Sequence, residues 1–422
     1  MFYHDGIAAA GVAALAKGRD AMTRSPAEFG IDLMSGEFFG NDPYPAFAWM
    51  RHHAPVFHDD ANDLWALACY DDVKAAGTDT ATFSSAGGIR PKFPGLPMMI
   101  DLDAPEHVRR RKLVSAGFTP RRVQAMEDQV RAVCDDVIDQ VCEQGSCDFV
   151  RDIAAPLPLN VIGDMLGVAR EDRSGLLRWS EDMLGSQGAA DPSGLEAAAQ
   201  AFEEYSAYME RVLADRRRTG AEGDLVGILV HAEIDGDRLD QLSLIHETLL
   251  ILIGGDETTR HVISGGMLAL FEHPWQRERL QADPGLLPAA VEEMLRWVTP
   301  IKDMVRTTTR EVELRGERIP EGAEIMLLYP SANRDEAVFE HADTFDTARA
   351  ANPHLAFGFG AHFCLGNQLA RLELRLMFER LFARLPDLAL AGLGPLPHRP
   401  SNFISGLESM PVTFTPTSRL GS

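Results

Sequence analysis

The chain has 422 residues, of which 45% are hydrophobic and 24% are charged, so it can bury a large core and is not a disordered polymer. Its formal net charge of −23 at pH 7 would repel phosphate backbones, which argues against nucleic acid as a partner. Five cysteines in so long a chain argue against a secreted disulfide framework, and the apolar stretch at residues 7–16 is too short to span a bilayer, so we expect a cytoplasmic protein without a transmembrane segment.

Hydrophobic periodicity predicts helices along most of the chain and short strands near both ends. A strand is expected at residues 64–70, and strands and turns at residues 311–330. Helices are expected, in chain order, at residues 71–76, 106–117, 121–143, 195–218, 239–270, 288–297 and 366–385. The middle of the fifth of these helices, LLILIGG, is apolar on all sides, which is typical of the centre of a large protein. The pattern predicts a mainly helical fold with a small β region, and a short helix or a loose extension at residues 7–16.

The most informative segment is FGFGAHFCLG, residues 357–366, in which glycines and aromatic residues surround Cys364 just before a predicted helix. Glycines at 360 and 366 let a backbone approach a flat ligand closely, and N–H groups at a helix N-terminus lower a thiol pKa. A cysteine thiolate on haem iron favours O–O cleavage, and a loop with these features suits such a ligand. A phosphate-binding loop is disfavoured because its third glycine is misplaced, and a plain buried cysteine in a turn is the other alternative.

This segment resembles the cysteine-ligand loop of the cytochromes P-450, whose pattern is F-x-x-G-x-x-x-C-x-G; Phe357, Gly360, Cys364 and Gly366 fit it. The resemblance implies a monooxygenase with haem b, Cys364 on the iron, and Phe357 and Gly366 beside the macrocycle. It extends from about residue 29 onward. It therefore implies one domain at residues 29–422, a triangular helical prism around a buried haem, after an extension at residues 1–28.

Glu293 and Arg296 form an E-x-x-R motif, and residues three apart on a helix share a face and can pair. Taken alone, the motif describes an ordinary surface pair. The resemblance implies instead that both join Arg349 in bracing the core around the haem.

Two glycines, Gly254 and Gly255, interrupt the apolar helix before Asp256, Glu257 and Thr258, and each glycine costs about 1 kcal/mol relative to alanine there. Close helix packing would explain the glycines, and so would room over a cofactor. The segment resembles the family's oxygen-binding groove, [AG]-G-x-[DE]-T. The resemblance implies that Glu257 and Thr258 are catalytic and supply protons during oxygen activation.

His107 and Arg111 lie on one face of a predicted helix, where they would ordinarily be surface residues. The resemblance implies that they bind the haem propionates together with Arg306 and His362, because carboxylates need such donors. A role for His362 as an axial ligand is disfavoured, since it lies two residues before Cys364.

A basic run stands out on this acidic chain and comprises Arg109, Arg110, Lys112, Arg121 and Arg122. A solvated helix face is the simpler interpretation. The alternative is a docking patch for an acidic ferredoxin, with an attraction that weakens in salt. The resemblance implies that electrons come from NAD(P)H through a ferredoxin reductase and a ferredoxin.

Five segments resemble one group within the superfamily, the actinobacterial steroid 26-monooxygenases: SSAGGIRP, LPMMIDLDAPEH, GGDETTRH, HLAFGFGAHFCLGNQLARLEL and NFISGLESMP. This implies hydroxylation of the terminal side-chain methyl of cholesterol or cholest-4-en-3-one, which an apolar, methionine-containing pocket would suit. The candidate pocket residues, each of which could equally belong to the core, are Ile89, Met98, Met99, Gly254, Ile301, Val305 and Ile404.

Two other functions stay open. The same chemistry could act on a polyketide, a terpenoid or a fatty acid in secondary metabolism. A haem protein could also sense a ligand without turnover, but Glu257 and Thr258 argue against that, because a sensor needs no proton relay.

Overall fold

The computed structural model describes residues 26–185, 192–233, 236–392 and 394–420. The helix or extension expected at residues 7–16 lies outside the described residues. Within the described ranges, no helix is both long enough and apolar enough to cross a membrane.

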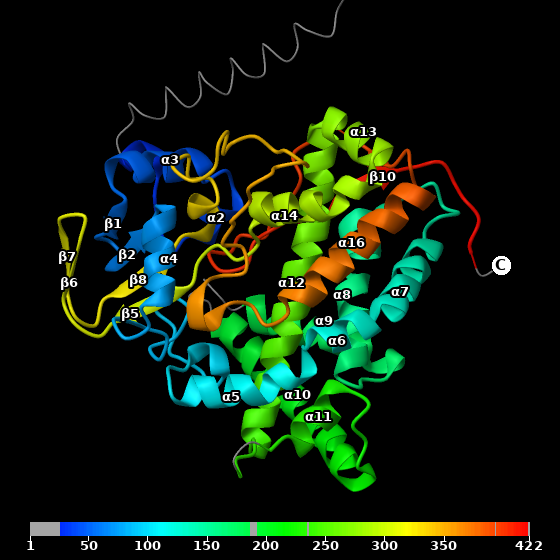
Figure 1. Ribbon diagram of the computed structural model, residues 1–422, viewed down its shortest axis with the longest axis horizontal. Coiled ribbons are helices and arrows are strands. Elements are labelled where there is room, and N and C mark those ends of the chain that lie inside the picture. Colours follow the sequence, from blue (N-terminus) through cyan, green and yellow to red (C-terminus); the bar gives the residue numbers. More distant parts are fainter. Residues whose placement is uncertain (1–25, 186–191, 234–235, 393, 421–422) are drawn as a thin grey trace, which may run out of the picture.

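Helices make up most of the molecule, and a small sheet lies at one side (Figure 1). The helices are α2 (Gly36–Gly40), α3 (Tyr44–His53), α4 (Tyr70–Thr78), α5 (Glu106–Val114), α6 (Pro120–Ala125), α7 (Glu127–Asp139), α8 (Pro156–Met165), α9 (Arg173–Gly185), α10 (Pro192–Thr219), α11 (Leu225–His231), α12 (Gln241–Glu272), α13 (Pro274–Ala282), α14 (Leu287–Val298), α15 (Tyr329–Ala332) and α16 (Asn367–Arg384). The prediction of a mainly helical chain with a small β region is confirmed.

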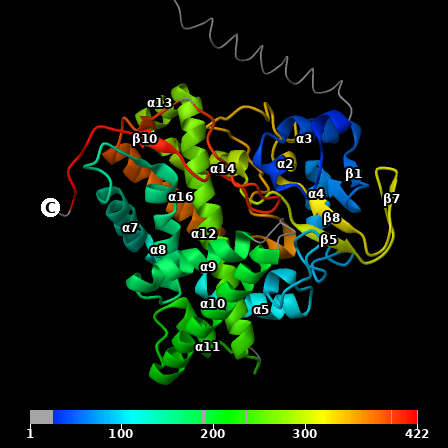
Figure 2. The ribbon, with the colours of Figure 1, turned by 180° about the vertical axis from the view of Figure 1, so that it is seen from behind.

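The long helix α12 runs through the middle of the molecule, and both opposite views show other helices around it (Figures 1 and 2). Asp240 caps its N-terminus by accepting a hydrogen bond from the Ser243 N–H at 2.7 Å. Its apolar residues are buried against α8, α14 and α16. The fifth predicted helix, residues 239–270, is confirmed as a central helix.

Two other predicted helices end several residues before the position that their hydrophobic pattern predicted. The helix expected at residues 106–117 becomes a 3₁₀ turn after Val114, and the one expected at residues 121–143 is interrupted at Met126 and ends at Asp139. The expected strand at residues 64–70 ends at Leu67, and the segment at residues 311–330 forms strands and turns before α15 begins. Periodicity thus located these elements but not their ends.

The main sheet has the strand order β1–β2–β8–β5–β3, and β2 and β8 are its parallel pair. The strands are β1 (Val56–Asp59), β2 (Leu64–Leu67), β3 (Phe83–Ser84), β4 (Ser146–Asp148), β5 (Val305–Thr308), β6 (Val312–Leu314), β7 (Glu317–Ile319), β8 (Glu324–Leu327), β9 (Ala389–Leu390) and β10 (Pro411–Thr413). Side chains alternate across β5: Val305 packs with Leu64 and Met326 beneath α2 and α3, whereas Arg306 faces a cavity. The sheet therefore forms one wall of that cavity.

Candidate active site

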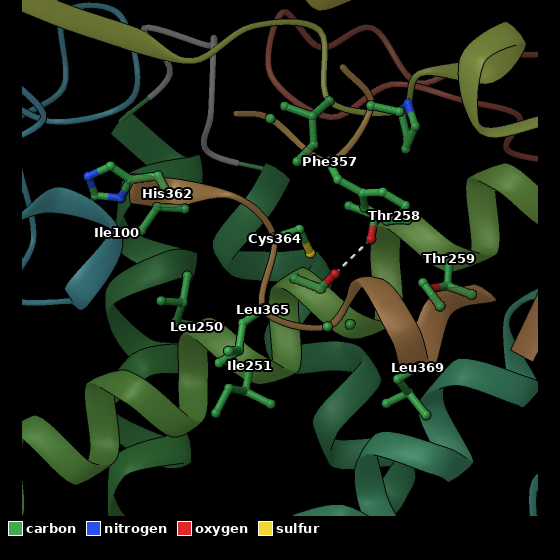
Figure 3. Close-up of a pocket in the computed structure, with 18 of the residues that line it drawn as sticks. Ile100, Leu250, Ile251, Thr258, Thr259, Phe357, His362, Cys364, Leu365 and Leu369 are labelled. Carbon is green, nitrogen blue, oxygen red and sulfur yellow. Dashed lines mark hydrogen bonds between the residues drawn. The ribbon is translucent and has the colours of Figure 1, made fainter. Parts of the chain in front are cut away.

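A cavity of about 1420 Å³, partly open to solvent, lies among α12, the loop before α16 and the sheet. Figure 3 shows Cys364 on the loop and Thr258 on α12, both at the edge of this space.

Main-chain hydrogen bonds hold the Cys364 loop in place. The Cys364 N–H donates to the Phe357 carbonyl at 2.8 Å, and the Asn367 side chain donates to the Cys364 carbonyl at 2.7 Å. Burial raises the pKa of the Cys364 thiol, while the Gly366 N–H, Arg111 and Arg371 lower it. The helix N-terminus therefore contributes as expected, but burial outweighs it, and the net pKa shift of the free thiol is upward.

The two glycines of the loop have different roles. A Cβ at Gly360, whose φ is +73°, would collide with the Gly77 carbonyl oxygen at the end of α4. Gly360 is therefore needed for packing on α4, which is a reason for glycine that the sequence did not indicate. Gly366 lines the cavity, and a Cβ built there would meet nothing within 4 Å.

Four basic side chains gather at one part of the cavity wall: His107, Arg111, Arg306 and His362. The His107 Nε2 and Arg306 Nε atoms are buried without a hydrogen-bond partner among the described residues. The two histidine rings lie 4.1 Å apart, and His362 Nε2 lies 3.2 Å from the Ser85 hydroxyl. Burial, Arg306, His107 and Arg111 lower the pKa of His362 to about 3.

Such a cluster of buried donors needs anionic oxygen acceptors. A flat ligand with carboxylate arms at this end and a metal above Cys364 would satisfy it. Phe357 also lines the cavity, and its ring lies 4.6 Å from the Arg371 guanidinium. The residues present therefore fit the haem that the sequence predicted.

The expected proton-supplying pair is split between two faces of α12. Thr258 lines the cavity, and its hydroxyl donates to the Gly254 carbonyl at 2.6 Å (Figure 3). Glu257, which is fully buried, is not among the described lining residues and contacts Arg260 and Arg399, the latter at 2.7 Å. Glu257 therefore lies behind the part of the wall that Thr258 lines.

Asp256 is also buried, and neither of its carboxyl oxygens has a hydrogen-bond partner within the described part of the chain. Burial, followed by the nearby Glu257, raises the pKa of Asp256 to about 8. It is not part of the cavity wall that the structure describes. Burial therefore favours the neutral form of this extra acid.

The brace residues meet in one buried cluster. Glu293 accepts hydrogen bonds from Arg296 at 2.7 and 2.8 Å and from Arg349 at 3.0 Å. Arg296 also donates to the carbonyls of Asn333 and Ala342, each at 2.8 Å. The cluster ties α14 to the segment that leads to the Cys364 loop.

Only some of the residues expected to line the substrate pocket do line this cavity. Met99, Gly254 and Ile301 line the cavity. Ile89 and Ile404 instead form a small apolar cluster that packs against Ile301 from behind.

Two further pocket candidates also lie elsewhere in the structure. Met98 belongs to the main core, and Val305 points to the far side of the sheet because strand side chains alternate. Within the described residues, none of these four reaches the wall.

Several wall residues were not foreseen. Tyr329 and Glu373 line the cavity, and so do Leu250 and Ile251 of α12. Burial, followed by the nearby Asp256, raises the pKa of Glu373 well above its ordinary value. The sequence did contain a sign of this role, because Glu373 is an acid within the otherwise apolar face of the last helix, α16.

The basic run does not form one face. Arg109 pairs with Glu106 and lies 3.1 Å from Asp237, and Arg110 turns inward toward the Pro97 carbonyl. Arg121 and Arg122 are exposed. Only part of the run is therefore free to meet another protein.

The neighbouring glycines Gly254 and Gly255 should respond in opposite ways to alanine. A Cβ at Gly255 would lie 2.5 Å from Ile162 Cδ1, whereas one at Gly254 meets nothing within 4 Å. Gly255→Ala is expected to destabilise the fold by up to about 2 kcal/mol, because overpacking exceeds the gain in helix propensity. Gly254→Ala should stabilise it by up to about 1 kcal/mol and narrow the cavity. Urea unfolding of both variants tests this, and equal effects would contradict it.

Comparison with known proteins gives matches over most of the chain. The family model for cytochrome P-450 matches residues 190–386. The steroid C26-monooxygenase of Mycobacterium tuberculosis is 52% identical over 95% of this chain and 100% of its own length. The steroid C26-monooxygenase of Mycolicibacterium smegmatis is 51% identical over 92% of this chain and 97% of its own. Among solved structures, the cytochrome P-450 PksS of the Bacillus subtilis bacillaene polyketide synthase has a TM-score of 0.83 at 31% identity, over 91% of this chain and 100% of its own.

Proposed function

Because this chain belongs to the cytochrome P-450 family and is a haem monooxygenase, we propose that it hydroxylates the terminal side-chain methyl of cholesterol or cholest-4-en-3-one. The observation that carries the proposal is one cavity with the Cys364 thiol, a donor cluster for carboxylates and Thr258 on its walls. The names of the two relatives with 52% and 51% identity support the choice of a steroid.

The cavity wall suits an apolar substrate. Beyond the donor cluster, the wall is formed by aliphatic and methionine side chains, including Met99, Ile100, Leu250, Ile251 and Ile301. Apolar walls with few polar groups bind apolar ligands by burial of their surface. A rigid sterol fits this requirement, with its flexible side chain toward the Cys364 and Thr258 end.

When bound, haem supplies the reductive activation of dioxygen, so that R–H, O₂, two electrons and two protons give R–OH and water. The residues that would hold the haem are Cys364, through its sulfur, and His107, Arg111, Arg306 and His362. Thr258 supplies a hydroxyl at the cavity, where it can donate a proton. In this proposal the Glu257 Oε1 atom, which has no partner among the described residues, relays protons toward Thr258.

Two arginines tie Glu257 to acids nearer the surface. Arg399 joins Glu257 to Glu408, and Arg260 joins it to Glu181 at 3.4 Å. Glu181 and Glu408 are both partly exposed. The two arginines therefore fix the position of Glu257 behind Thr258, and as permanently charged guanidinium groups they do not themselves pass protons to it.

The two electrons come from NAD(P)H through a ferredoxin reductase and a ferredoxin in this proposal. The exposed Arg121 and Arg122 offer positive charge on a chain of net charge −23. An acidic ferredoxin would be attracted to them, and raised salt would weaken that attraction.

Thr258→Ala is expected to lower the rate of hydroxylation by about 10²-fold, the lower end of the range for a positioned proton donor. Reducing equivalents should still be consumed, so product per NAD(P)H falls. Thr258→Ser keeps the hydroxyl and should restore most of the ratio. Product and NAD(P)H, measured together, test this, and an unchanged ratio in the alanine variant would contradict it.

The substrate is tested by titrating the haem-loaded protein with cholest-4-en-3-one and following the haem absorption band. A saturable spectral shift at low ligand concentration is expected. If the sterol causes no shift and a polyketide, terpenoid or fatty acid does, the result would favour a hydroxylase of secondary metabolism. A reduced protein that holds dioxygen indefinitely would instead indicate a sensor.

A further inference from the structure

One buried acid of α12 has no part in the mechanism above. Glu247 is fully buried, and its Oε1 atom accepts hydrogen bonds from the Met99 N–H at 2.9 Å and from Arg110 at 3.3 Å. Its Oε2 atom has no partner among the described residues. Burial raises the pKa of Glu247 to about 7, with Asp101 also raising it, although Arg110 and the Met99 N–H lower it. A carboxyl is costly at such a position, so its presence needs an explanation.

The segment that Glu247 contacts is also held from a second helix. Arg110 of α5 donates to the Pro97 carbonyl at 2.8 Å and to Glu106 at 3.1 Å. The Pro97–Met99 segment is therefore fastened at one end to α5 and at the other to α12. Pro97 and Met98 lie in a bend, and a single 3₁₀ turn, Met99–Asp101, follows. So little regular structure leaves side chains to fix the geometry of the segment.

This segment leads directly into the cavity wall. Met99 and Ile100 line the cavity, and so do Leu250 and Ile251, which follow Glu247 by three and four residues. Residues three or four apart lie on one face of a helix, so Glu247 continues the lining face of α12. The Glu247–Met99 hydrogen bond thus joins two adjacent parts of the wall and sets their relative position.

We propose that Glu247 is a positioning residue for substrate, which fixes the Pro97–Ile100 segment against α12 and so determines which substrate carbon reaches the Cys364 end of the cavity. The inference rests on the proposed function, because the sterol must lie against both of these parts of the wall. Arg110 acts with Glu247 from the other side of the segment.

The test compares Glu247→Leu with Glu247→Gln in the haem-loaded protein. Leucine removes the acceptor of the Met99 N–H at nearly unchanged size, whereas glutamine keeps an acceptor oxygen. In Glu247→Leu, KM for the sterol should rise about tenfold, as expected for a buried N–H left without its acceptor. Its kcat should change less than about twofold, which is the signature of lost substrate binding. Hydroxylation should also spread to further positions, and glutamine should restore KM and product pattern.

Glu106→Gln is the matched control, because Glu106 also contacts Arg110 but lies at the surface. It should leave KM and product pattern unchanged. If KM and product pattern of Glu247→Leu match those of the wild type, or if kcat falls with KM unchanged and glutamine does not rescue it, Glu247 does not position substrate. If the leucine variant fails to bind haem, Arg110→Leu gives the same test from α5, where an unchanged KM would overturn the proposal.

A substrate-free readout separates this inference from the proposed function. Hydrogen exchange at the Met99 amide should be faster in Glu247→Leu than in the wild type and in Glu247→Gln. If the wild type binds no sterol, the proposed function fails, and the exchange rates still decide whether Glu247 holds the segment. Equal exchange at Met99 in all three proteins would overturn the inference while leaving the function intact.

Discussion

Cys364→Ser is expected to abolish monooxygenase turnover without unfolding the protein. The hydrogen bonds that hold the loop use the main chain of Cys364, with Phe357 and Asn367 as partners, so serine leaves them in place. Serine removes the sulfur that donates electron density to haem iron and favours O–O cleavage. Product formation with the sterol should therefore fall to background, and the reduced, carbon-monoxide-treated protein should lose the absorption band of a thiolate-bound haem.

Cys147→Ser is the matched control for this change. Cys147 lies in β4, which pairs with β10 in a separate sheet, and it does not line the cavity that the structure describes. This variant should keep both the absorption band and the turnover of the wild type. Full activity of Cys364→Ser, or a loss of the thiolate band in Cys147→Ser, would contradict the assignment of the ligand.

Glu293→Ala is expected to produce the largest loss of stability. It leaves Arg296, which is fully buried, without its carboxylate partner, and it also removes the acceptor of Arg349. Breaking a buried ion pair in this way costs about 3–5 kcal/mol. Whole domains are stable by only about 5–15 kcal/mol, so the variant should lose much of its haem at moderate urea concentrations.

The comparison for Glu293→Ala is Glu233→Ala. Glu233 pairs with Arg238 at the surface, where both side chains are exposed, and such pairs contribute less than about 1 kcal/mol. Urea unfolding followed by circular dichroism and by haem absorption measures both variants. Similar losses in the two proteins would show that the E-x-x-R cluster does not brace the core.

The features that the sequence predicted well are local ones. The Cys364 loop is a contiguous run of residues, and the spacing of Glu293 and Arg296 on one helix already places them on one face. The central position of α12 followed from an apolar surface on all its sides. In each case the prediction depends only on residues that lie close together in one segment of the sequence.

The features that the sequence did not predict depend on how elements are rotated against one another. Val305 and Arg306 are neighbours, yet only Arg306 faces the cavity, and Thr258 does so while Glu257 does not. A shift of one residue exchanges the two faces of a strand, and sequence alone does not fix which face meets the cavity. The contact of Glu247 with Met99 joins residues 148 positions apart, so no local pattern reports it.

The net pKa shift of the Cys364 thiol is another property that the sequence alone could not predict. The sequence indicated correctly that a helix N-terminus follows the cysteine, and the Gly366 N–H does lower the thiol pKa. The net shift is nevertheless upward, because burial is a property of the assembled cavity and not of the loop. Binding of a cation at the sulfur would therefore be needed to hold it as a thiolate.

The most direct test of the proposed function is the turnover of cholest-4-en-3-one by the haem-loaded protein, with a surrogate ferredoxin and reductase, under isotopically labelled dioxygen. The predicted result is a single main product that carries one labelled oxygen on a terminal methyl of the side chain, with formation that requires both NAD(P)H and Cys364. A product that lacks the label, or hydroxylation confined to the sterol rings, would contradict the proposed function.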